Sequence, residues 1–138
     1  MVRITRKADF AASHFLSNPE WTPEENERVY GVESRPCGHG HNFVIEVTVG
    51  GEPDPVDGMV MDLKTLKEII NREVMEPYDH RFLNHEAPPF DRIVPTPENM
   101  AREIWRKIEP QVRGENRRLE SIRLYETPDL YVDYDGGE

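Results

Sequence analysis

The chain has 138 residues, of which 36% are hydrophobic and 32% charged, and its formal net charge is −10. This length is typical of a single domain over residues 1–138, and a mean hydropathy of −0.75 indicates a polar surface. Without a signal peptide or a long apolar run, we expect a cytoplasmic protein with no membrane contact. The acidic balance argues against a nucleic-acid partner, because nucleic-acid binding depends on Lys and Arg neutralising phosphates. The single cysteine, Cys37, excludes an intramolecular disulfide.

The first half of the chain predicts two strands. Residues 2–15 begin with alternating apolar side chains and predict one strand, with His14 near its end. A polar insert follows, in which Thr22 and Pro23 predict the start of a short helix. A second strand is predicted from about residue 39 to residue 50, and a turn-rich connection with several Gly and Pro residues comes after it.

The second half predicts two helices and then two more strands. Asp62 is a good N-cap for a helix over residues 63–76, which Pro77 would end. Thr96 caps the other helix, with Pro97 at its first position. Two strands close the chain on either side of a Thr-Pro turn. This order of elements predicts an α+β fold with an antiparallel sheet.

His39 and His41 stand at the start of the second strand, where a period of two places both imidazoles on one face. Neutral imidazole is the commonest protein ligand of zinc, and a catalytic zinc takes three protein ligands and keeps one position open. The third ligand would be His14, His80, His85 or a carboxylate. His14 is favoured because the small residues before it leave room. The alternative is that the His-Gly-His run is a polar strand start without a metal.

Other residues carry acid–base or nucleophilic chemistry. Asp79 beside His80 can fix the tautomer of the imidazole, although such pairs also occur in solvated turns. Cys37 and Glu33 precede the histidine pair, where a thiol or a shielded carboxylate can act as acid or base. A lone cysteine can equally be inert packing. Glu126 interrupts an apolar strand end and either binds a planar N–H edge in a bidentate manner or faces solvent.

Six motifs in order resemble the 6-pyruvoyltetrahydropterin synthase family, which includes the 6-carboxytetrahydropterin synthases of queuosine biosynthesis. The resemblance spans nearly the whole chain. The motifs are Phe10–His14, Gly38–Phe43, Gly58–Leu63, Asp79–Asn84, Pro95–Asn99 and Tyr125–Thr127. The resemblance implies a tunnelling fold: a four-stranded antiparallel sheet with two helices on one face. It also implies homo-oligomers, in which trimers close a barrel, two trimers stack into a hexamer, and the sites lie between subunits.

The resemblance implies that Zn²⁺ is held by His14, His39 and His41. The implied substrate is the pterin 7,8-dihydroneopterin triphosphate, whose side-chain hydroxyls zinc would acidify and whose triphosphate would leave by elimination.

The resemblance also assigns residues to the substrate. It implies that Glu126 anchors the pterin ring, with backbone contacts near Thr96 and Pro97. Asp79 and His80 would relay protons between the ring and its side chain.

One position departs from the family pattern. The typical synthase has its catalytic cysteine six residues before the first histidine of the pair, and this chain has Glu33 there. In the queuosine branch the cysteine lies four residues before, where this chain has Arg35, and Cys37 lies only two before His39. A subgroup uses glutamate and releases 6-hydroxymethyl-7,8-dihydropterin for folate synthesis. From the family resemblance as a whole, we expect a zinc-dependent pterin lyase of the 6-pyruvoyl type. The alternatives are the hydroxymethyl type, the 6-carboxy type, a catalytically inactive zinc- and pterin-binding homologue and a structural zinc domain.

Overall fold

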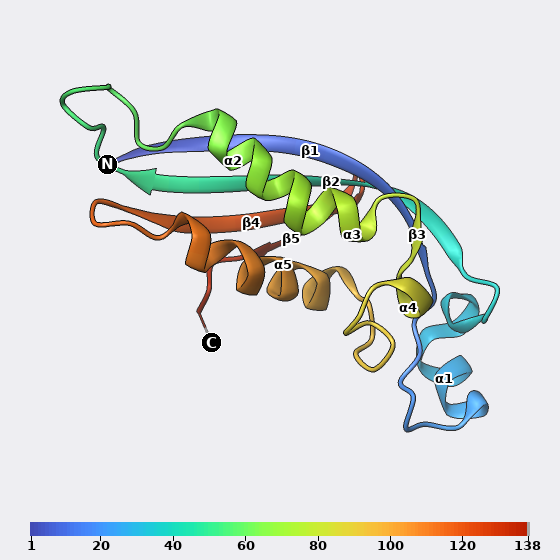
Figure 1. Cartoon of the computed structure of the whole chain (residues 1–138). Coiled ribbons are helices and arrows are strands. Elements are labelled where there is room, and N and C mark those ends of the chain that lie inside the picture. The colour runs from blue at the N-terminus through green and yellow to red at the C-terminus, as the bar shows by residue number, and fades with distance from the viewer. Residues whose placement is uncertain (138) are drawn as a thin grey trace.

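The computed structural model describes residues 1–137. It consists of a curved sheet with helices covering one face (Figure 1). Within these residues the sheet has four long antiparallel strands. They are β1 (Val2–His14), β2 (His39–Gly51), β4 (Arg117–Thr127) and β5 (Leu130–Tyr134). A two-residue strand, β3 (Arg81–Phe82), runs parallel to β1 and makes the order β3-β1-β2-β4-β5. The antiparallel α+β prediction is confirmed for the long strands. The sequence did not indicate β3, because two residues carry no periodicity.

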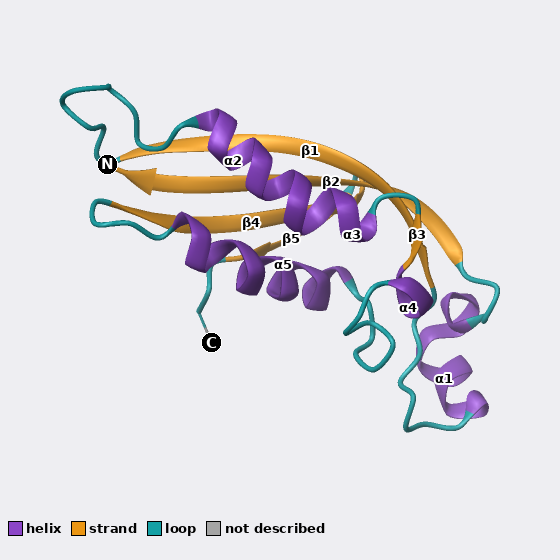
Figure 2. Cartoon of the chain, viewed as in Figure 1, coloured by secondary structure: helices purple, strands orange, loops and turns teal. Residues whose placement is uncertain are grey.

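Two helices cover one face of the sheet, as Figure 2 shows most clearly. They are α2 (Leu63–Ile70) and α5 (Pro97–Val112). The predicted caps are present: the side chains of Asp62 and Thr96 accept bonds from backbone N–H groups at 2.8 and 3.2 Å. Each helix therefore begins where the sequence predicts.

Pro77 does not end the first of these helices, so that prediction was wrong. After α2 the backbone widens into a π-helical turn, η2 (Asn71–Met75), and then forms a last turn, α3 (Glu76–Tyr78), which contains Pro77. A π turn shifts the hydrogen-bond partners by one residue. Pro77, which lacks an N–H, is thereby accommodated without breaking the continuous helical segment from α2 to α3.

Further helical elements gather at one end of the sheet, where β1 ends and β2 begins (Figure 1). They are α1 (Pro23–Tyr30), the 3₁₀ turn η1 (Gly31–Ser34) and α4 (Leu83–Glu86). The predicted helix start in the insert is confirmed, since Thr22 Oγ1 accepts from a backbone N–H at 3.2 Å. In the described chain no helix is both long enough and apolar enough to cross a membrane.

The hydrophobic core lies between the sheet and the two covering helices. Every second residue of β2 faces it, and the rings of Phe10 and Phe43 stack with centroids 5.1 Å apart. The opposite face is polar, and there the hydroxyls of Thr5 and Thr48 lie 2.8 Å apart. At the end of β1 and the start of β2, the core-facing positions are taken by histidines.

Candidate active site

Three imidazoles converge on the covered face of the sheet. In the β1–β2 ladder His14 lies opposite His39, and Ala12 lies opposite His41. The candidate ligand nitrogens all lie within 4.8 Å of one another, so the group could hold a metal ion. The structure therefore brings together the three predicted metal ligands. The period of two along β2 and the pairing with β1 explain why.

The hydrogen bonding of His14 prepares it for a metal. Its Nδ1 donates to the Pro95 carbonyl at 2.8 Å, which leaves Nε2 as an acceptor. Within the described residues, the Nε2 atoms of His14 and His41 are buried without a hydrogen-bond partner. Orphaned buried nitrogens are rare, and a metal ion would satisfy both. The donor set therefore fits zinc, which favours imidazole nitrogen.

Burial favours the neutral form of the His14 and His41 imidazoles. It lowers the pKa of His14 to about 4, although the Pro95 bond opposes the shift, and the neighbouring imidazoles lower it further. Burial is also the largest cause that lowers the pKa of His41, followed by the charge of His39. Neutral imidazole is the form that binds a metal.

Glu126 enters the same site from β4. The register between β4 and β5 shifts between Tyr125 and Thr127, so Glu126 is the extra residue of a β-bulge. Its Oε1 lies 3.6 Å from His41 Nε2, and its side chain is 12% exposed. The bulge thus places a carboxylate next to the imidazole cluster.

Other acids surround the Glu126 carboxylate. Burial is the largest cause that raises the pKa of Glu126, followed by the charges of Glu33 and Glu98. Glu98 lies in the first turn of α5, directly after Thr96 and Pro97. A charge at the start of α5 therefore acts on the Glu126 carboxylate.

Glu33 and Cys37 both lie before β2, and both are exposed. Glu33 belongs to η1, where its backbone carbonyl accepts from Leu16 N–H at 2.7 Å. Its charge raises the pKa of both His41 and Glu126. Cys37 is exposed on the turn that follows. Electrostatically, the carboxylate is part of the imidazole site.

Asp79 and His80 form a hydrogen-bonded pair at the edge of the sheet. Asp79 Oδ1 lies 3.0 Å from His80 Nδ1 and accepts from Ala11 N–H at 2.9 Å. His80 has a φ of 61° and donates its own N–H to the Ala11 carbonyl at 2.6 Å. The bond from Ala11 is the largest cause that lowers the pKa of Asp79. Both residues are therefore pinned to β1.

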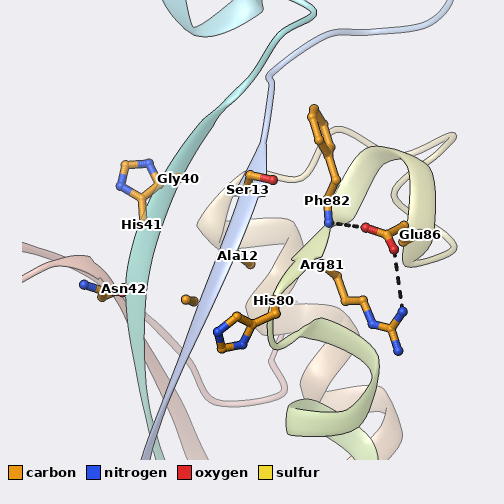
Figure 3. Close-up of a pocket in the computed structure, with 10 residues that line it drawn as sticks. Ala12, Ser13, Gly40, His41, Asn42, His80, Arg81, Phe82 and Glu86 are labelled. Carbon is orange, nitrogen blue, oxygen red and sulfur yellow. Dashed lines mark hydrogen bonds and ion pairs between the residues drawn. The ribbon is translucent and has the colours of Figure 1, made fainter.

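The pair opens toward the uncovered face. The His80 side chain is 82% exposed and lines a hollow of about 500 Å³, together with Ser13 and Asn42, which alternate away from the core. Figure 3 shows the imidazoles of His41 and His80 separated by β1 and β2. Within one chain, the structure does not bring the pair onto the face that carries the three converging imidazoles.

Two supporting groups were missed from the sequence. The Asn84 side chain accepts from Phe15 N–H at 2.9 Å and donates to the Phe15 carbonyl at 3.0 Å, so it fixes the chain just after His14. Asn84 is the last residue of the Asp79–Asn84 family motif, which was the available signal. Pro95 begins another of these motifs, but the role of its carbonyl could not be read from the residue type, because any residue can supply a backbone acceptor.

The fold and site together define a tunnelling-fold lyase. A family model described as 6-pyruvoyl tetrahydropterin synthase matches residues 3–137. The chain belongs to this family.

Similar proteins agree with that assignment. The 6-pyruvoyl tetrahydrobiopterin synthase of Poecilia reticulata is 42% identical over 96% of this chain and 89% of the relative. That of Pongo abelii is 40% identical over 97% of this chain and 91% of the relative. A solved 6-pyruvoyl tetrahydropterin synthase from Caenorhabditis elegans is 33% identical, with a TM-score of 0.89 over 99% of this chain and 96% of that one. A 6-carboxy-5,6,7,8-tetrahydropterin synthase of Rickettsia felis is more distant, at 25% identity over 96% of this chain and 99% of the relative. These comparisons confirm the predicted family, fold and enzyme class.

Proposed function

We propose that the chain is a zinc-dependent lyase that converts 7,8-dihydroneopterin triphosphate to a 6-pyruvoyltetrahydropterin-type product. The observation that carries this proposal is the convergence of three imidazoles. In two of them, Nε2 is buried and has no hydrogen-bond partner among the described residues. His14, His39 and His41 would hold Zn²⁺, in keeping with a catalytic site that keeps an open position. The metal would supply Lewis acidity that lowers the pKa of the substrate's side-chain hydroxyls.

Glu126 would anchor the pterin ring. A carboxylate presents two acceptor oxygens in one plane, which matches the adjacent N–H and NH₂ groups of a pterin edge. Burial and nearby acids already disfavour the charged form of Glu126, so a ligand that donates two hydrogen bonds would be strongly preferred there. Backbone groups near Thr96 and Pro97 would contact the ring from the start of α5.

Asp79 and His80 would move protons during elimination of the triphosphate. The carboxylate fixes the imidazole through Nδ1, which leaves Nε2 to give and take a proton. Because β1 and β2 separate the His80 imidazole from that of His41 (Figure 3), we propose that each site takes this pair from a second copy of the chain. Edge strand β5 supports assembly, since an edge offers unpaired backbone groups to a neighbouring strand. A trimeric barrel, stacked into a hexamer, would place such sites between subunits.

A second candidate product follows from Glu33. Its charge acts on both His41 and Glu126, although Glu33, like Cys37 on the next turn, is exposed. Glu33 would then be the acid or base at the substrate side chain, and the product would be 6-hydroxymethyl-7,8-dihydropterin. The 6-carboxy product is a weaker candidate, because Arg35 holds the position of that branch's cysteine.

Incubation of the zinc-loaded protein with 7,8-dihydroneopterin triphosphate tests the proposal, with products identified by mass spectrometry. We expect release of triphosphate together with a pterin whose mass distinguishes the three product types. A chelator-treated sample is the control, and added Zn²⁺ should restore turnover. Pterin binding without any product would instead show a catalytically inactive homologue, and no bound zinc would contradict the metal assignment.

A further inference from the structure

Lys107 on α5 reaches across to the segment that carries the Asp79–His80 pair. Its Nζ lies 3.0 Å from the hydroxyl of Tyr78 and 3.2 Å from the carbonyl oxygen of Glu73. Tyr78 is the last residue of α3 and directly precedes the pair. The ammonium group of Lys107 therefore binds both α3, through Tyr78, and the π-helical turn η2 before it, through Glu73.

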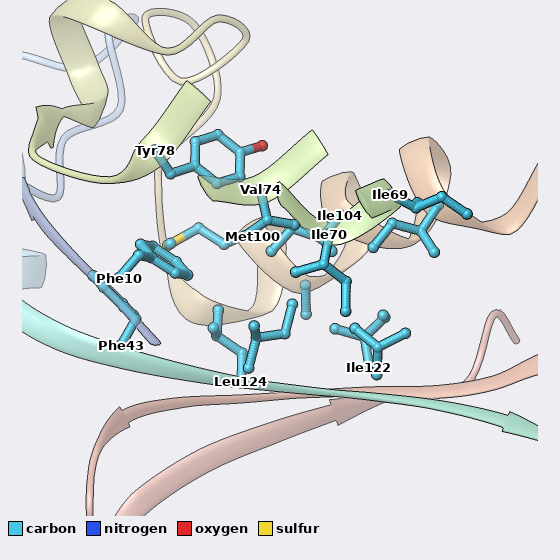
Figure 4. Packing of buried hydrophobic residues seen from close by; sticks show 14 of the residues in the cluster. Phe10, Phe43, Ile69, Ile70, Val74, Tyr78, Met100, Ile104, Ile122 and Leu124 are labelled. Atoms are coloured by element: carbon cyan, nitrogen blue, oxygen red, sulfur yellow. The ribbon is translucent and has the colours of Figure 1, made fainter. Parts of the chain in front are cut away.

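Tyr78 is fully buried, so its hydroxyl needs a partner. Its ring packs against that of Phe10, with centroids 5.9 Å apart (Figure 4). It also packs against the ring of Phe90, with centroids 6.0 Å apart. Burial raises the pKa of Tyr78, which keeps the hydroxyl protonated. Lys107 supplies the hydrogen bond, and burial lowers its own pKa although Glu103 opposes the shift. A buried hydroxyl without this donor would cost stability.

The second contact of Lys107 compensates for Pro77. A proline has no N–H, so it cannot bond to the carbonyl four residues earlier, which is that of Glu73. Lys107 donates to this carbonyl instead. The backbone is thus held in its widened helical path up to the residue before Asp79.

We infer that Lys107 is a positioning residue for the Asp79–His80 pair, because it fixes the helix end from which the pair projects toward Ala11. The pair is otherwise tied by its two bonds to the N–H and carbonyl of Ala11 and by the bond from Asp79 N–H to the Met75 carbonyl. Lys107 and Ala11 therefore hold the segment from opposite sides. The inference rests on the proposed role of the pair in proton transfer.

Four variants test this role. Lys107→Met removes the ammonium at similar length and should lower kcat about tenfold, with KM and zinc content unchanged, because small misplacements of a proton-transfer group are costly. Tyr78→Phe should act in the same direction. Lys107→Arg keeps a donor and should recover most of kcat. The control is Lys67→Met on the exposed face of α2, which should leave kcat unchanged.

The double variant Lys107→Met/Tyr78→Phe separates positioning from stability. It removes both polar partners, so its resistance to urea should return toward that of the wild type. Its kcat should nevertheless stay low, because Lys107 no longer ties the helix end to α5. Recovery of kcat together with stability would show a merely structural contact and overturn the inference.

Hydrogen exchange supplies a readout that does not need turnover. The His80 N–H donates to the Ala11 carbonyl, and in Lys107→Met and in the double variant it should exchange about tenfold faster than in the wild type. Unchanged exchange in both would overturn the inference even if wild-type turnover is normal. A wild type that binds zinc but makes no product would contradict the proposed function alone, and the exchange rates would still decide the role of Lys107.

Discussion

Glu126 Oε1 lies 3.6 Å from His41 Nε2, a spacing that links the proposed ring anchor to the proposed metal cluster. The β-bulge in β4 brings the carboxylate to this position, and strand pairing brings the imidazole there. A carboxylate beside a metal-ligand imidazole stabilises positive charge at the site and is stabilised by it in return. Zinc binding and pterin binding should therefore favour each other.

Glu126→Gln should weaken pterin binding about 10- to 100-fold, because it removes a charge-assisted hydrogen-bond acceptor. Fluorescence titration with neopterin, which carries no triphosphate to eliminate, measures the affinity. Zinc content should be unchanged, because three imidazoles remain. The exposed Glu115→Gln variant is the matched control. Wild-type affinity in Glu126→Gln would disprove the anchor.

The metal-free protein should lose stability as the pH falls from about 6.5 to about 4. The pKa of His14 is lowered to about 4 in the folded state, so between these values the unfolded chain binds more protons than the folded one. The free energy of unfolding should therefore fall by up to about 3 kcal/mol across this window and level off below it. Urea titrations in the presence of a chelator measure it.

Two histidine variants isolate that effect. The glutamine of His14→Gln cannot titrate, so in this variant the free energy of unfolding should change much less with pH across the same window than it does in the wild type. The exposed His85→Gln variant should keep the wild-type slope. A slope that survives in His14→Gln would assign the pH dependence to other groups.

Glu33→Gln and Cys37→Ala should differ sharply in turnover. If the Glu33 carboxylate is the acid or base at the substrate side chain, Glu33→Gln should lower kcat about 100-fold, while Cys37→Ala should retain the wild-type rate. Product quantification by mass spectrometry at saturating substrate measures both. Glu27→Gln on α1 controls for loss of charge in the insert. The reverse pattern would make the thiol the active group.

Two inactive variants should complement each other if sites form between chains. His80→Ala lacks the proton-relay imidazole, and His39→Ala lacks a metal ligand. After they are unfolded together and refolded, about a quarter of the sites should combine an intact half from each chain. Turnover should rise accordingly, whereas mixing the folded variants briefly should give none. Absence of recovery despite formation of mixed oligomers would place each complete site within one chain.

Several features of the fold were predictable because they depend on local rules. The shared face of His39 and His41 follows from the strand period, and the helix starts follow from Asp62 and Thr96 as caps. The convergence of His14 depends on strand pairing across a long insert. The small residues before His14 favoured it as the third ligand, and the family resemblance implied the complete set.

Other features arise from tertiary context and had no local signal. The bulge at Glu126 depends on how β4 meets β5, and the π turn before Pro77 depends on packing against α5. The Lys107 contacts join residues 29 and 34 positions apart. Residue type alone could not reveal these contacts.

The hydrogen bond from Leu16 N–H to the Glu33 carbonyl closes residues 17–32 into a loop. This loop and the paired strands β1 and β2 differ in their tolerance to insertions. The strands pair without a bulge from Val2–Gly51 to His14–His39, and a single inserted residue in either would turn its histidines to the opposite face. Residues 17–32 leave and return at the 2.7 Å bond, so changes in their length need not move Glu33. This stretch is where natural chains of this fold can acquire new sequence, and where an engineer can graft a loop.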